Sequence, residues 1–162
     1  MLKNYQQRVV GDVRALFSDL DTARQTFDST PALQALGSYV ALAMSGQKYM
    51  QFSDRPMTGK STLYPRVCIK MPTGGGKTLV AVETIRSYQN LFAKRKTGLV
   101  VWITHREQIY RQTIENLQDK SHPYRQLLDQ ASGNRTLILE KGQLLRRQDV
   151  EENLVVLMLM IQ

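Results

Sequence analysis

Residues 71–78 of the chain read Met-Pro-Thr-Gly-Gly-Gly-Lys-Thr. They follow a short β-branched run at Val67–Met71, and apolar side chains recur at helical spacing over residues 78–93. Glycines between a strand and a helix let the backbone curl so that several N–H groups point inward, and this arrangement holds a phosphate. The segment is therefore predicted to be a phosphate-binding loop (P-loop) that opens a helix.

The residue types in this loop predict how a nucleotide would be held. Lys77 would place a positive charge on the β- and γ-phosphates, and the hydroxyl of Thr78 would bind Mg²⁺. The N-terminal end of the helix would add its positive dipole. ATP and Mg²⁺ are the expected cofactors, with Lys77 as the catalytic residue and Thr78 as the metal ligand. The expected phosphate-binding residues are Thr73, Gly74, Gly75, Gly76, Lys77 and Thr78.

The strict form of the motif, G-x-x-x-x-G-K-[ST], has glycine where this chain has Met71. Glycine-rich turns also join strands to helices without a ligand, so a purely structural turn stays an alternative. A second Gly-Lys-Ser at residues 59–61 serves as a comparison, because no apolar strand precedes it and Pro65 would block a following helix. We expect residues 59–61 to lie in a loop without a ligand.

Helical patterns dominate the N-terminal part of the chain. Apolar residues at steps of three and four predict a helix over residues 2–20, and Pro31 suits the first turn of a second helix over residues 31–45. Residues 46–65 are polar and show no period, which indicates a loop. We therefore expect residues 1–65 to form a helical segment that ends in a polar loop.

Strands and helices alternate over residues 66–162. Thr104 to Glu107 has the pattern of a capping box that opens a helix through about Leu117. Alternation of this kind predicts an α/β fold with a mainly parallel sheet that is covered on both faces. Further apolar runs predict strands at Leu99–Ile103, Leu137–Leu139 and Leu154–Ile161.

The composition favours an acidic partner inside the cell. The chain has 22 Lys and Arg against 14 Asp and Glu, a formal net charge of +8, which favours nucleic acid, although a solvated basic surface explains the charge equally well. Cys68 is the single cysteine, so no internal disulfide can form. The N-terminus lacks the apolar core of a signal peptide, and Leu154–Ile161 is too short to span a bilayer. A cytoplasmic location without membrane contact is expected.

Three segments together resemble superfamily-two helicases and translocases, and most of all the Res subunit of type III restriction endonucleases. They are Tyr5-Gln6-Gln7, Pro72–Thr78 and Leu99–Thr113, and the resemblance covers residues 2–113 in patches. Helicase P-loops relax the position at which Met71 stands. The resemblance implies a RecA-like P-loop NTPase, a three-layer sandwich that this chain would contain in incomplete form.

The resemblance also implies roles for residues outside the P-loop. Gln6, with Gln7 as the alternative, would read the adenine, since an amide both donates and accepts hydrogen bonds. Thr104 and Arg106 would contact the phosphate backbone of nucleic acid, unless Arg106 is only a solvated residue and Thr104 only a helix cap. The family often has Asp where this chain has His105.

A helicase also needs a strand that ends in Asp-Glu to hold Mg²⁺ and position the attacking water. Glu151-Glu152 is the adjacent acidic pair of this chain, but it precedes an apolar run instead of following one. The chain is therefore expected to be the front part of a longer protein, able to bind ATP but slow or inactive in hydrolysing it.

The resemblance implies double-stranded DNA, the remainder of a Res polypeptide and a modification (methyltransferase) subunit as partners. Two other classes stay open. A small-molecule kinase shares the P-loop, and a non-enzymatic basic module could bind DNA or a protein partner with a disused P-loop.

Overall fold

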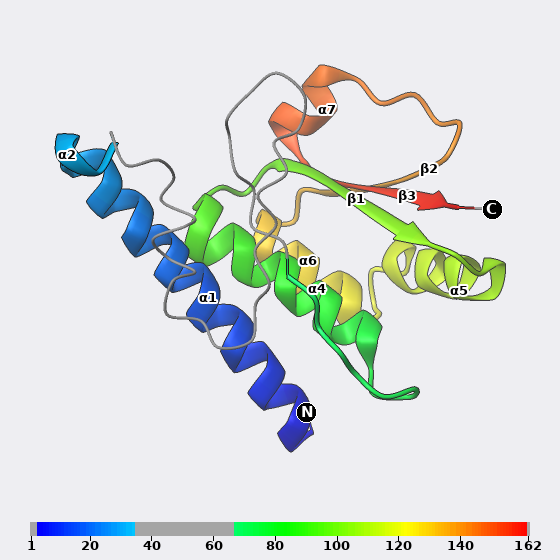
Figure 1. The fold of residues 1–162 in the computed structure, drawn as a ribbon. Coiled ribbons are helices and arrows are strands. Elements are labelled where there is room, and N and C mark those ends of the chain that lie inside the picture. The colour runs from blue at the N-terminus through cyan, green and yellow to red at the C-terminus, as the bar shows by residue number, and fades with distance from the viewer. Residues whose placement is uncertain (1–2, 35–66, 162) are drawn as a thin grey trace. The chain divides into compact units, whose positions relative to one another are not determined.

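The computed structural model describes residues 3–34 and 67–161, and the chain divides into two compact units, Met1–Gly75 and Gly76–Gln162. Figure 1 shows the ribbon with its helices and strands labelled. The boundary between the units falls inside the glycine-rich segment, and each unit is described by itself below. The polar loop predicted for residues 46–65, with its Gly-Lys-Ser, lies outside the described residues.

The first unit contains one long helix, α1 (Asn4–Ser29), followed by α2, which is described over Pro31–Gln34. The rest of the helix predicted over residues 31–45 lies outside the described residues. The predicted helix over residues 2–20 is confirmed, but α1 continues for nine more residues, to Ser29. Side-chain pairs within the helix support this extension, because Asp21 accepts hydrogen bonds from Arg24 at 2.7 Å and from Gln25 at 2.6 Å. The buried residues of α1 include a helical stripe of Val10, Val13, Leu16 and Leu20.

The second unit contains the predicted helices and strands from residue 78 onward in their predicted order, with two helices, α6 and α7, that were not predicted. Helix α4 passes directly into a π-helical turn, η1, and each of the three strands is preceded or followed by helix. The elements are α4 (Lys77–Ser87), η1 (Tyr88–Ala93), β1 (Gly98–Thr104), α5 (Glu107–Gln118), α6 (Pro123–Ser132), β2 (Thr136–Glu140), α7 (Arg147–Glu152) and β3 (Leu154–Met160).

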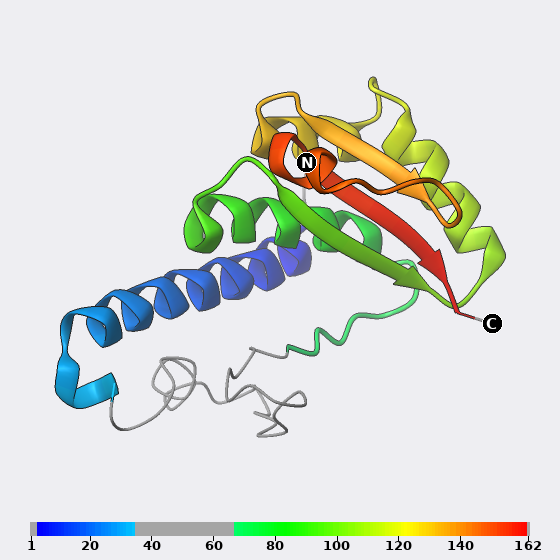
Figure 2. The same ribbon diagram turned by 90° about the horizontal axis from the view of Figure 1, so that it is seen from above.

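The three strands of this unit form one parallel sheet in the order β1-β3-β2. Helices α4, α5 and α6 lie on one face of it, as the two views in Figures 1 and 2 show. The core between them contains Val82 of α4, Leu117 of α5 and Leu128 of α6, packed with alternate residues of β3. This parallel α/β arrangement confirms the predicted fold class.

The opposite face of the sheet is apolar at β1. Leu99, Val101 and Ile103 are 44%, 48% and 53% exposed, whereas Val100 and Trp102 point to the helix-covered face and pack against the core. The alternation follows from the period of two along a strand. In the part of the chain that the structure describes, helices α4, α5 and α6 therefore form a layer on one face, while these three side chains stay uncovered on the other.

Two local predictions are wrong. Val67–Met71 was expected to be a strand, but residues 67–72 have neither strand nor helix, and no described strand pairs with them to complete a ladder. Thr104 was expected to cap a helix, but it is the last residue of β1, and the N-cap position of α5 is held by Arg106, whose side chain makes no capping hydrogen bond. Pairing explains the second error, because Thr104 lies opposite Met160 and its carbonyl accepts a hydrogen bond from Ile161 N at 2.9 Å.

No helix among the described residues is both long enough and apolar enough to cross a membrane.

Candidate functional site

The turn at residues 72–76 requires glycine at three consecutive positions, for two different reasons. Gly74 and Gly76 have φ angles of 73° and 77°, in the left-handed region that side chains rarely enter. Gly75 is limited by space, because a Cβ atom there would lie 2.9 Å from the carbonyl oxygen of Pro72. The same turn is closed by a hydrogen bond from Gly75 N to Pro72 O at 3.1 Å. The backbone therefore curls as the sequence predicted.

Helix α4 begins at Lys77, immediately after this turn, and the prediction that Lys77 and Thr78 open a helix is confirmed. Gly76 is the N-cap residue and, as a glycine, has no side chain with which to cap the helix. The first helical hydrogen bond runs from Val80 N to Gly76 O at 3.1 Å, so the N–H groups of the three residues before Val80 lie outside the helical ladder. These groups and the positive end of the helix dipole favour an anion.

The functional side chains of the turn differ in exposure. Thr73 and Lys77 are exposed, whereas Thr78 is half-buried and Gly75 is buried. A lysine at the first helical position and a hydroxyl at the second are the groups that a magnesium triphosphate requires. The residues present thus fit Mg-ATP in kind and in local backbone conformation, and their roles in binding it stay predictions.

Gln6 lies in the same compact unit as Gly75 and contacts it directly. The Nε2 atom of Gln6 donates to the carbonyl oxygen of Gly75 at 2.9 Å, although 69 residues separate them in the sequence. The Oε1 atom of Gln6 accepts a hydrogen bond from Lys3 N at 2.9 Å, which ties the side chain to the start of α1. Gln6 is only 6% exposed, whereas its neighbour Gln7 is exposed. The structure therefore favours Gln6 over Gln7 as the residue next to the turn.

Tyr5 makes a contact that the sequence did not predict. Its hydroxyl donates to the same carbonyl oxygen of Gly75, at 3.1 Å. The sequence marked Tyr5 only as the first residue of the Tyr5-Gln6-Gln7 segment. A hydrogen bond across 70 residues depends on tertiary structure, so no local pattern could have indicated it.

The second predicted contact, to nucleic acid, concerns the junction between β1 and α5. Arg106 is exposed at the N-cap of α5, and His105 beside it is also exposed. Thr104 is buried, and among the described residues its hydroxyl is the one buried side-chain polar atom without a hydrogen-bond partner. In this conformation Arg106 can reach a ligand in solvent, whereas the Thr104 hydroxyl is shielded from it.

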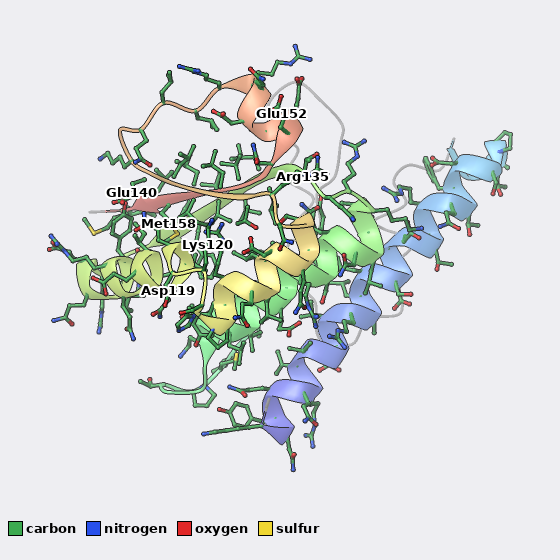
Figure 3. All side chains as sticks on the ribbon, turned by 180° about the vertical axis from the view of Figure 1, so that it is seen from behind. Asp119, Lys120, Arg135, Glu140, Glu152 and Met158 are labelled. Carbon is green, nitrogen blue, oxygen red and sulfur yellow. The ribbon has the colours of Figure 1, made fainter. Side chains whose placement is uncertain are left out.

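The acidic pair Glu151-Glu152 lies at the end of α7, immediately before β3 begins. Glu151 pairs with Arg147 at 2.6 Å, and Glu152 accepts a hydrogen bond from Gln148 at 2.7 Å. Figure 3 shows Glu152 at one end of the sheet and Glu140, the last residue of β2, at the other. The pair therefore sits at the amino end of a parallel strand, whereas ligands of such sheets bind at the carboxyl ends.

Among the described residues, no group of three or more His, Cys, Asp or Glu side chains is arranged to hold a metal ion.

The comparisons with known proteins agree with this geometry. Residues 1–158 match the family model described as type III restriction enzyme, res subunit. Neither the curated proteins nor the solved structures gave a match. The match takes in α1, the glycine-rich turn and the parallel sheet as far as Met158, so this chain belongs to the res-subunit family of type III restriction enzymes, whose domain is a P-loop NTPase.

Proposed function

We propose that this chain binds Mg-ATP, as the ATP-binding front part of a DNA translocase that serves restriction. The observation that carries the proposal is the turn itself. Two glycines with positive φ and a third without room for a side chain lead directly into helix α4, whose N-cap residue is itself a glycine. A turn that needs three glycines and opens directly onto a helix N-terminus suits a ligand that binds backbone N–H groups.

Each residue of the proposed site has one role. Gly74, Gly75 and Gly76 shape the turn around the phosphates, with Thr73 at its exposed entrance. Lys77 neutralises charge on the β- and γ-phosphates, and Thr78 binds Mg²⁺. Thr78 would hold the Mg²⁺ ion, which would supply positive charge to offset the negative charge of the phosphates.

Gln6 is the proposed adenine contact, because it is the amide side chain that the fold brings to the turn. Arg106 is the proposed contact to the phosphate backbone of double-stranded DNA, since it is exposed at the start of α5. Thr104 could join it only after a local rearrangement that exposes its hydroxyl. The remainder of a Res polypeptide and a modification subunit are the proposed protein partners, in line with the family.

The site is proposed to bind ATP without turning it over efficiently. None of the three described strands ends in Asp-Glu: β1 ends at Thr104, β2 at Glu140 and β3 at Met160. Strand β2 ends in a single glutamate, Glu140, which is followed by Lys141 and not by a second acidic residue, so the described strands lack the Asp-Glu pair that would hold Mg²⁺ and position the attacking water. Hydrolysis is therefore expected to be far below the enzyme median of about 10 s⁻¹.

Calorimetric titration of the chain with Mg-ATP, with and without the Lys77→Ala substitution, tests the proposal. The wild type should bind, and the variant should lose about 10- to 100-fold in affinity, since hydrogen bonds to charged groups contribute about 1.5–3 kcal/mol. Lys94→Ala, which removes a lysine from the end of η1, is the matched control and should bind as the wild type does. Equal affinities for the wild type and Lys77→Ala would contradict the proposed function.

A further inference from the structure

One carbonyl group of the turn is held by two side chains from another part of the chain. The oxygen of Gly75 accepts hydrogen bonds from Tyr5 Oη at 3.1 Å and from Gln6 Nε2 at 2.9 Å. All three residues belong to the compact unit Met1–Gly75. Two donors on consecutive residues of α1 therefore converge on one backbone acceptor at the centre of the glycine-rich turn.

Holding this carbonyl also fixes an N–H group. The peptide that joins Gly75 to Gly76 is trans and planar, so its N–H points away from the side on which the carbonyl is held. Phosphate-binding turns work through N–H groups that are fixed in direction before the anion arrives. A peptide between two glycines rotates more freely than others, because neither residue has a Cβ to restrict it. An outside restraint on this peptide is therefore useful for binding.

The two donors are not equivalent. The amide of Gln6 is fully used in this conformation, since Oε1 accepts from Lys3 N while Nε2 donates to Gly75. Reading an adenine would need the same donor and acceptor atoms. The Tyr5 hydroxyl has no such second role, so it can hold the Gly75 carbonyl whether or not the Gln6 amide turns to a base.

We propose that Tyr5 is a positioning residue for the phosphates: its hydroxyl, together with Gln6, orients the Gly75–Gly76 peptide so that the N–H of Gly76 faces the anion. This inference rests on the proposed nucleotide site and adds a residue that acts on the triphosphate and not on the base. Its ring is 38% exposed at the start of α1, so loss of the hydroxyl removes the hydrogen bond without emptying a core position.

Tyr5→Phe removes the hydroxyl and keeps the ring. Affinity would be measured calorimetrically for three ligands: Mg-ATP, Mg-GTP and magnesium tripolyphosphate. One hydrogen bond between neutral groups corresponds to about a two- to tenfold change in an equilibrium constant. The expected result is a loss of this size, equal for all three ligands, because the hydroxyl acts through a backbone group that contacts phosphate only.

Tyr88→Phe is the matched control, since Tyr88 is 41% exposed but lies in η1, away from the turn in sequence. It should bind all three ligands as the wild type does. The ¹⁵N–¹H resonance of Gly76 provides an independent readout, because a peptide that is freed to rotate changes its amide shift in Tyr5→Phe and not in Tyr88→Phe. Thermal unfolding of both variants would verify that they are equally folded.

Two outcomes would overturn the proposal. In the first, Tyr5→Phe binds every ligand like the wild type. In the second, the variant weakens ATP and GTP but not tripolyphosphate, which would place the hydroxyl near the base or sugar. Both are distinguishable from failure of the proposed function, in which the wild type itself binds none of the ligands and Lys77→Ala changes nothing.

Discussion

Helices α4 and α6 begin in opposite ways. At α6 the chain satisfies its own backbone: His122 Nδ1 accepts a hydrogen bond from Tyr124 N at 3.2 Å, and Pro123 occupies the first turn, where it needs no N–H partner. At α4 the N-cap residue is Gly76, in a left-handed conformation, which has no side chain to accept a hydrogen bond from the first turn. The start of α6 is capped by residues of the chain itself, and this capping stabilises the helix. The start of α4 is shaped entirely by glycines and is suited to an external acceptor.

The largest expected effect comes from adding a side chain to the glycine-rich turn before α4. Gly75→Ala would place a Cβ 2.9 Å from the oxygen of Pro72, a backbone atom that cannot move without opening the turn. We expect more than tenfold weaker binding of Mg-ATP by calorimetry, since the N–H groups would no longer converge.

Gly11→Ala is the matched control for this variant. Gly11 lies within α1, and a Cβ there meets nothing within 4 Å. Alanine should stabilise that helix by up to about 1 kcal/mol without altering ATP affinity. If both substitutions left ATP binding unchanged, the glycines of the turn would have only a structural role.

A smaller effect is expected at α6. His122→Ala removes the side-chain acceptor for Tyr124 N, which should cost about 1 kcal/mol of unfolding free energy in denaturant titrations. His122→Asn should restore most of the loss, because asparagine is a favoured N-cap. Neither variant should alter ATP affinity. A loss of nucleotide binding in His122→Ala would contradict the assignment of a purely structural role to the start of α6.

The smallest effect concerns the turn that leads into α6. Ser121 donates to Asp119 Oδ1 from its hydroxyl at 2.7 Å and from its backbone N at 2.8 Å, and these bonds lower the pKa of Asp119 below its usual value. Ser121→Ala removes the hydroxyl bond, so the pKa of Asp119 should rise toward its usual value in NMR titrations.

The sign of the accompanying stability change follows from that shift. A carboxyl group with a lowered pKa contributes stability above its unfolded-state pKa, and this contribution is lost as the pH falls through the folded-state pKa. Ser121→Ala should therefore reduce the slope of stability against pH in the acid range. An unchanged Asp119 titration would mean that the backbone N–H alone sets the shift.

Two strands of the parallel sheet were predicted closely from the sequence. Uninterrupted apolar runs gave Leu99–Ile103 and Leu154–Ile161, and the structure has β1 at Gly98–Thr104 and β3 at Leu154–Met160. An uninterrupted apolar run is typical of a strand in a parallel sheet, because the side chains on both faces of such a strand are usually apolar. Helix α6 was missed, although Pro123 at its start and Gly133 at its C-cap are ordinary helix signals.

The remaining errors arise from contacts between distant parts of the chain. Thr104 looks like a helix cap locally, but pairing with Met160 retains it in the sheet. Val67–Met71 has strand composition, yet strand structure needs a partner as well as composition. In the candidate site, the glycine turn could be predicted from its residues alone. The two hydrogen bonds from α1 to Gly75 could not, because they join residues about 70 positions apart.

The strand order has a consequence for how the second unit assembles. Strand β3 lies between β1 and β2 and is hydrogen-bonded to both, yet it is the last of the three to be synthesised. On the ribosome, the segment up to Glu140 would thus emerge with β1 and β2 present but not paired, because these two strands do not hydrogen-bond to each other. The pairings of this sheet can form only once residues 154–160 have left the exit tunnel, because β1 and β2 both pair with β3 and both pairings join strands distant in sequence.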